Sequence, residues 1–178
     1  MASGVHWRAF MRLACEHLKD RIADIMLEMT ALTADEPWVS LPAEHRVDGL
    51  PNATERLFDW ALCDPENESH RVMALEVAAV HGRTRREQGL GDDVLLREYY
   101  LLREAIWRVV RALHGGDVTT EKVVVMGRLD RALSTSQRAA LLGYYSAELT
   151  ARGDWPHRLH LLCAEAALPP LAVAGPAR

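Results

Sequence analysis

The chain has 178 residues, of which 49% are hydrophobic and 26% are charged, a composition typical of one globular domain. Its net charge is −4 with acidic and basic residues interspersed, so it lacks the concentrated basic face expected of a nucleic-acid-binding protein. No run approaches the ~20 apolar residues of a membrane-spanning helix, and the N-terminus lacks the apolar core of a signal peptide. The sequence therefore predicts a cytoplasmic protein that binds neither a nucleic acid nor a membrane.

Apolar residues at helical spacing predict helices from the first residues onward. The spacing predicts one continuous helix from Val5 to Thr33, because no proline or glycine interrupts it and Pro37 follows it. Asn52 is predicted to begin a second helix, since Glu55 three residues later suits a capping box.

The centre of the chain contains the strongest helical pattern. Asp64 followed by Pro65 predicts the start of a third helix that reaches Gln88. Asp92 is expected to cap a fourth helix, whose apolar stripe recurs every three or four residues. The stripe consists of Leu95, Tyr99, Leu102, Ile106, Val109 and Leu113.

The last third of the chain predicts two further helices and a tail. A fifth helix is expected from Thr119 to Thr150, with a weak point, where a kink could form, at the serine and threonine cluster 134–136. A short helix is expected from His157 to Ala167. The proline-rich residues 168–178 are predicted to be a linker, which leaves 1–167 as one domain. Because no stretch alternates like a strand, the sequence predicts an all-α bundle of five to six helices.

The three cysteines predict no disulfide and no metal site. Cys15, Cys63 and Cys163 are odd in number, widely separated and each next to apolar residues, and no CxxC spacing occurs. Buried, reduced thiols are the expected state.

Residues 81–103 contain the segment HGRTRREQG followed by LLREYYLLR. This pair resembles the HGRxRxxQG…LLREYxxLR signature of the RsbRD N-terminal domain family (RsbT co-antagonist), although the flanking helices fit only in length and pattern. The resemblance implies a non-catalytic sensory or regulatory module of bacterial stress signalling, which dimerises and binds protein partners. Because related stressosome sensor domains resemble globins, it also implies a globin-like arrangement as one form of the bundle. The motif residues carried over are His81, Gly82, Arg83, Arg86, Gly89, Arg97, Glu98 and Arg103.

Two functions are open for His81. It ends an apolar run and is followed by Gly82, which costs a helix up to ~1 kcal/mol against alanine and so indicates that something approaches closely. A single imidazole beside an apolar wall could bind haem or another small ligand, with Tyr99 and Trp107 as further ligand-binding candidates. The alternative, which we favour, is a buried histidine bonded to a carboxylate or carbonyl of the next helix. Glu98 is the carboxylate that could accept a bond from His81 or from an arginine.

The arginines around the turn at Gly89 also allow two interpretations. They could form a docking patch for an anion or a protein partner. We instead expect Arg97 and Arg103 to pair with Glu98, Glu104 or Glu87 and fix how two helices cross. No phosphate loop, nucleophile elbow or HExxH motif occurs, so the chain is predicted not to be an enzyme and to need no resident cofactor. Trp7 and Phe10 near the N-terminus are candidates for a homodimer interface.

Overall fold

The computed structural model describes residues 2–36, 41–42, 49–112 and 119–167, with side chains from Trp7 onward. These residues form eight α-helices and one π-helical segment, with no strand among them, which confirms the predicted all-α class. The elements are α1 (Ala2–Asp20), α2 (Ile22–Leu32), α4 (Leu50–Phe58), η2 (Asp59–Cys63), α5 (Glu68–Glu87), α6 (Asp92–Ala112), α7 (Thr120–Tyr144), α8 (Ser146–Ala151) and α9 (Trp155–Glu165).

The first predicted helix is two helices, so the expected continuity was wrong. The break lies at Arg21, whose backbone has φ −105° and ψ 12° and whose N–H bonds the carbonyl of Leu18 at 3.1 Å. The change of direction lets α1 pack on α4 and η2 while α2 packs along α6. Each half therefore buries its own apolar face, with Leu18 on α1 and Ile25 on α2 both inaccessible to solvent.

The next two helices start at other residues than predicted. Helix α4 begins at Leu50 because Gly49 turns the chain with φ 75°, a left-handed conformation that suits glycine. Helix α5 begins at Glu68 because the side chain of Asn67, not that of Asp64, accepts from the first-turn N–H groups of Ser69 and His70. The expected capping box of the second helix is absent.

Helix α4 continues directly into the π-helical segment η2. The widened hydrogen bonding is visible where the N–H of Asp64 donates to the carbonyl of Asp59 at 3.0 Å, five residues back. Trp60 in this segment is completely buried, so the core holds the irregular turn in place.

Helix α7 runs without a break through residues 134–136, the weak point that the sequence indicated. Ser134 and Thr135 donate their hydroxyls to carbonyls four residues earlier, at 2.8 and 3.0 Å, and the helix stays intact. The break comes instead at Tyr145, which separates α8 from α7. Two breaks that the periodicity did not reveal thus explain why the helix count exceeds five or six.

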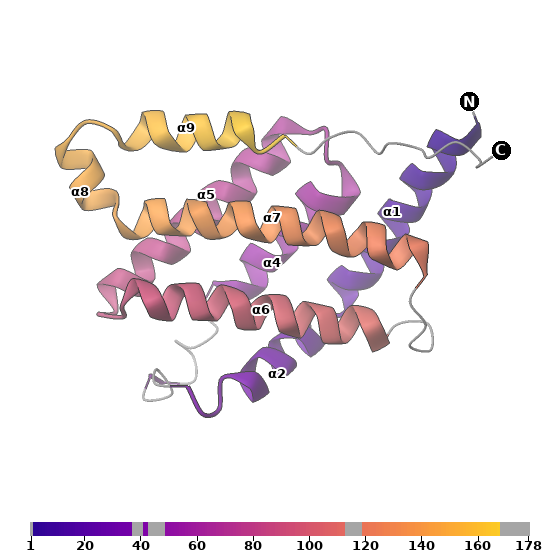
Figure 1. Cartoon of the computed structure of the whole chain (residues 1–178), viewed down its shortest axis with the longest axis horizontal. Helices are drawn as coiled ribbons and strands as arrows, with labels where there is room; N and C mark the ends of the chain where they lie inside the picture. The colour runs from indigo at the N-terminus through magenta and orange to yellow at the C-terminus, as the bar shows by residue number, and fades with distance from the viewer. Residues whose placement is uncertain (1, 37–40, 43–48, 113–118, 168–178) are drawn as a thin grey trace.

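In Figure 1 α6, α7 and α9 lie side by side, and α1, α4 and α5 cross behind them. The most extensive contact between described helices is that of α5 with α7. It is a crossing of small residues, in which Gly82 lies against the backbone of Ala140 and Gly143 lies against the backbone of Ala79. The C-terminal half of α5, which carries the first part of the motif, therefore contacts α7 through Gly82 and α6 through His81.

Two predicted segments, the tail 168–178 and the turn at 114–117, lie outside the described residues. Within the part of the chain that the structure describes, no helix is long and apolar enough to cross a membrane.

Candidate functional site

A buried cluster of three charged or titratable side chains joins α5 to α6. Glu98 on α6 accepts from two residues of α5: His81 through Nε2 at 2.8 Å, and Arg85 through Nε at 3.1 Å and Nη2 at 2.6 Å. His81 is 4% exposed and the other two are 1% exposed, so the cluster is shielded from water. Both carboxylate oxygens are engaged, and the paired arginine bonds are the strong bidentate arrangement.

Helical spacing explains why one carboxylate serves both partners. His81 and Arg85 are four residues apart on α5 and therefore lie on the same face, one turn above the other. Arg85 also donates from Nη1 to Gln88 Oε1 at 2.8 Å, which ties the cluster to the end of α5. The ring of Tyr99 lies edge-on to the imidazole, with centroids 6.2 Å apart.

The environment keeps Glu98 ionised. Burial by itself raises the pKa of its carboxyl, but the hydrogen bonds and charges of His81 and Arg85 outweigh burial and hold the pKa below its ordinary value. An ionised Glu98 can only accept, so Nε2 of His81 carries the proton in this hydrogen bond. Burial also raises the pKa of the Tyr99 hydroxyl far above its ordinary value, so Tyr99 stays neutral. The cluster is a fully bonded polar joint in the core.

Two glycines allow α5 and α7 to meet closely beside this joint. A Cβ on Gly82 of α5 would lie 2.6 Å from the carbonyl carbon of Ala140 on α7. A Cβ on Gly143 of α7 would lie 2.5 Å from the carbonyl carbon of Ala79 on α5. The expectation that something approaches Gly82 closely is confirmed, and the approaching group is the backbone of α7.

The remaining motif residues on α5 connect it to the C-terminal helices. Arg86 donates to the carbonyl of Tyr144 at 3.1 Å and to Glu148 of α8, and its guanidinium lies 5.3 Å from the centre of the Tyr144 ring. Gly89 ends the helix with φ 76°, a conformation that glycine adopts without strain. Arg83 is exposed and has no hydrogen bond or ion pair with the described residues.

The expected partners of Arg97 and Arg103 were wrong. Arg97 bonds Glu36, beyond the end of α2, at 2.8 Å, and Arg103 bonds Asp130 of α7 at 2.9 Å. Both arginines therefore fix helix positions, as expected, but through carboxylates from segments remote in sequence. Glu98 is taken by Arg85, whose central place the sequence analysis missed although its spacing from His81 was the available signal.

The three ligand-binding candidates do not gather around one cavity. His81 and Tyr99 pack together in the core, whereas Trp107 lines a surface cavity of about 250 Å³ with Tyr100 and Arg103. Two other hollows in the described part of the structure, of about 240 and 460 Å³, are lined by neither His81 nor Tyr99. Because Nε2 of His81 donates to Glu98, ligation of haem through that nitrogen would require this bond to break.

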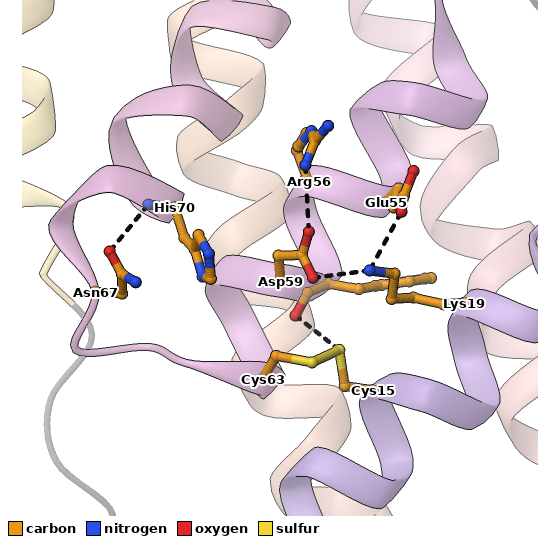
Figure 2. Close-up of polar contacts among 9 residues, drawn as sticks. Cys15, Lys19, Glu55, Arg56, Asp59, Cys63, Asn67 and His70 are labelled. Atoms are coloured by element: carbon orange, nitrogen blue, oxygen red, sulfur yellow. Dashed lines mark hydrogen bonds and ion pairs between the residues drawn. A yellow bond between two sulfur atoms is a disulfide. The ribbon is translucent and has the colours of Figure 1, made fainter.

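The prediction that all three cysteines are reduced thiols was wrong. Cys15 of α1 and Cys63 of η2 form a disulfide across 48 residues of sequence, and only Cys163 is a free, buried cysteine. Figure 2 shows the bond beside a contact between the same two elements, in which Lys19 donates to Asp59 at 3.0 Å. Sequence spacing gave no sign of the pair, because the bond depends on how α1 docks on the π-helical turn.

Comparison of the chain with protein-family models, with curated proteins and with solved structures finds no match. The resemblance to the RsbRD N-terminal domain family therefore rests on the motif, and the globin-like arrangement stays a prediction from the sequence.

Proposed function

We propose that this chain is a non-catalytic sensory or regulatory module of a bacterial stress-response or signal-transduction protein, which acts by dimerising and by binding other proteins in a signalling complex. The observation that carries the proposal is where the motif lies. Seven of the eight motif residues, all but Arg83, either end a helix or contact another element or the segment that follows it. A motif used in this way preserves a particular arrangement of helices.

The buried joint is suited to transmit a change of packing. His81 and Arg85 move with α5 and Glu98 moves with α6, so a shift between these helices alters three short hydrogen bonds in a site shielded from water. Such bonds are directional and strong away from water, which favours a small number of discrete arrangements. A signal would act by binding one arrangement better than another.

The proposed self-contact uses the N-terminal helix. Trp7 and Phe10 stack edge-on at 5.7 Å on α1, and Leu13 one turn later is 51% exposed. Phe10 and Leu13 also border the apolar hollow of about 240 Å³ between α1 and α7. An exposed leucine beside such a hollow is the kind of surface that a second copy would cover.

Exposed Arg83 is the motif residue left for a partner. It lies on α5 one residue after the crossing glycine, so a protein bound to it would touch the helix that supplies His81 and Arg85.

Native mass spectrometry combined with an absorption spectrum of the same sample tests the proposal. We expect a dimer of the bare chain mass with no Soret band, and we expect Leu13→Glu to yield monomer. Leu161→Glu on α9, at a leucine of similar exposure (44%), is the matched control and should leave the dimer intact. A bare monomer of the unaltered chain would refute the dimer. A bound mass together with a Soret band lost in His81→Ala would instead establish the alternative function, a haem- or small-ligand-binding sensor.

A further inference from the structure

The disulfide belongs to a pair of matched contacts between α1 and η2. On α1 the residues are Cys15 and Lys19, and on η2 they are Cys63 and Asp59, each pair four residues apart. Cys15 bonds Cys63 and Lys19 bonds Asp59, so the two elements run antiparallel with one covalent and one ionic contact (Figure 2). Lys19 also reaches Glu55 at 3.2 Å, one turn earlier. The ionic contact and the apolar core can therefore hold α1 in register when the covalent contact is absent.

The two sulfurs differ in access. Cys15 is completely buried, whereas Cys63 is half-buried and lines a hollow of about 460 Å³ that opens to solvent. This hollow is the side from which a small thiol would approach Cys63. Cys63 is also the last residue of the π-helical turn, an irregularity often found at functional sites.

The buried sulfur of Cys15 has a hydrogen-bond acceptor beside it when the disulfide is reduced. The Sγ of Cys15 lies 3.5 Å from the carbonyl oxygen of Phe58, which can accept the hydrogen of a Cys15 thiol. The same pocket thus accommodates the bonded sulfur and the free thiol without leaving a buried donor unsatisfied.

From these observations we propose that the Cys15–Cys63 disulfide is a site of reversible thiol–disulfide exchange, entered at Cys63 by a small thiol, and that its state controls how tightly α1 is held. The thiolate of the small thiol attacks Sγ of Cys63, the S–S bond breaks, and its electron pair leaves on Sγ of Cys15, which takes a proton. A second small thiolate then attacks the small-molecule sulfur of this mixed disulfide. The Cys63 thiolate is released, and the two small thiols leave joined as a disulfide. Two electrons pass to the protein, and the reverse reaction with a small-molecule disulfide restores the bond.

The competing hypothesis is that this cluster binds a divalent cation. The ligand atoms of Cys15, Asp59 and Cys63 lie within 4.8 Å of one another, and Nδ1 of His70, at the edge of the same hollow, has no hydrogen-bond partner among the described residues. Two facts favour exchange instead: the sulfurs are bonded to each other, and the carboxylate of Asp59 is occupied by Lys19. The chemistry does not depend on the proposed signalling role, and its test needs no output protein.

The first experiment equilibrates the full chain in glutathione buffers of varied redox ratio, then alkylates it in denaturant and counts the labels by intact mass. Of the three cysteines, we expect one label under oxidising conditions and three under reducing conditions, with a reversible change between them. Hydrogen exchange of the Ala2–Asp20 amides should become about tenfold faster on reduction, while that of Trp155–Glu165 stays the same. The proposal is overturned if the number of alkylated cysteines is the same in all buffers. It is also overturned if the amide hydrogen exchange of α1 is the same in the oxidised and the reduced protein. A reduced chain that retains one zinc per chain and then resists oxidation overturns it as well.

Two single variants test the point of entry. In Cys15→Ser the unpaired Cys63 should form a mixed disulfide with oxidised glutathione, whereas in Cys63→Ser the buried Cys15 should form none. The buried Cys163 is present in both variants and is the common background. Equal labelling of both variants, or labelling of Cys15 alone, refutes entry at Cys63. The unaltered chain supplies the label count, so the redox proposal stays testable even when a serine variant folds poorly.

Discussion

Replacing Glu98 by glutamine should destabilise the protein far more than any surface ion-pair variant. The change keeps the side-chain volume but removes the charge that compensates Arg85, which is 1% exposed and cannot turn to water. Removing one partner of a buried ion pair costs about 3–5 kcal/mol, because the other charge remains buried without compensation. Glu148→Gln is the matched control. It breaks the pair between Arg86 and Glu148, whose side chains are 38% and 45% exposed, and should change the free energy of unfolding very little because solvent screens exposed charges.

Urea unfolding followed by far-ultraviolet circular dichroism measures both free energies. A double variant, Arg85→Met with Glu98→Leu, removes both charges and so separates the cost of leaving Arg85 buried without a partner from the contribution of the ion pair itself. It should recover much of the unfolding free energy that Glu98→Gln loses. The remaining loss should be about 1–3 kcal/mol, since His81 no longer has its acceptor. If Glu98→Gln costs no more than Glu148→Gln, the reasoning that this joint holds α5 on α6 is refuted.

Three further outcomes are expected. The pKa of Glu98 lies below its ordinary value of 4.5, so its stabilisation is complete above that pH and is lost as pH falls through the lowered pKa. The difference in unfolding free energy between wild type and Glu98→Gln should therefore shrink in acid, and a constant difference down to about pH 3 would contradict this. Gly82→Ala should lower the melting temperature because its Cβ meets the backbone of α7, whereas Gly127→Ala on α7 meets nothing and should stabilise by up to about 1 kcal/mol; equal shifts would argue against the close crossing. Reducing the Cys15–Cys63 bond, which spans 48 residues, should lower the unfolding free energy by about 4 kcal/mol on the loop-closure scale, and a urea midpoint unchanged by reductant would contradict it.

The sequence by itself determined the class of fold and the course of its central helices. Helical spacing of apolar residues predicted α6, which begins at Asp92, the residue expected to cap it. Glycines predicted the end of α5. These features are local, because periodicity and turn chemistry depend on residues a few positions apart. The bond between His81 and Glu98 was expected across two successive helices, and local spacing could have added Arg85, one turn from His81 on the same face.

Only the tertiary structure decided how the elements meet. The break at Arg21 is not marked by a proline or a glycine, and it lets α1 pack mainly on η2 while α2 packs mainly on α6. Arg97 and Arg103 had acidic neighbours on their own helix, yet they bond Glu36 and Asp130, because distance in space and not in sequence selects the partner of a charge.

The disulfide shows the same limit most clearly. Cys15 and Cys63 are unremarkable as sequence positions, and their bond forms because a π-helical turn places Cys63 opposite α1 at the level of Cys15. Gly82 revealed a close approach, but Gly143, its counterpart, could be identified only once the crossing of α5 and α7 was known. Periodicity specifies which face of a helix is buried, and the packing of whole helices decides which residues that face will touch.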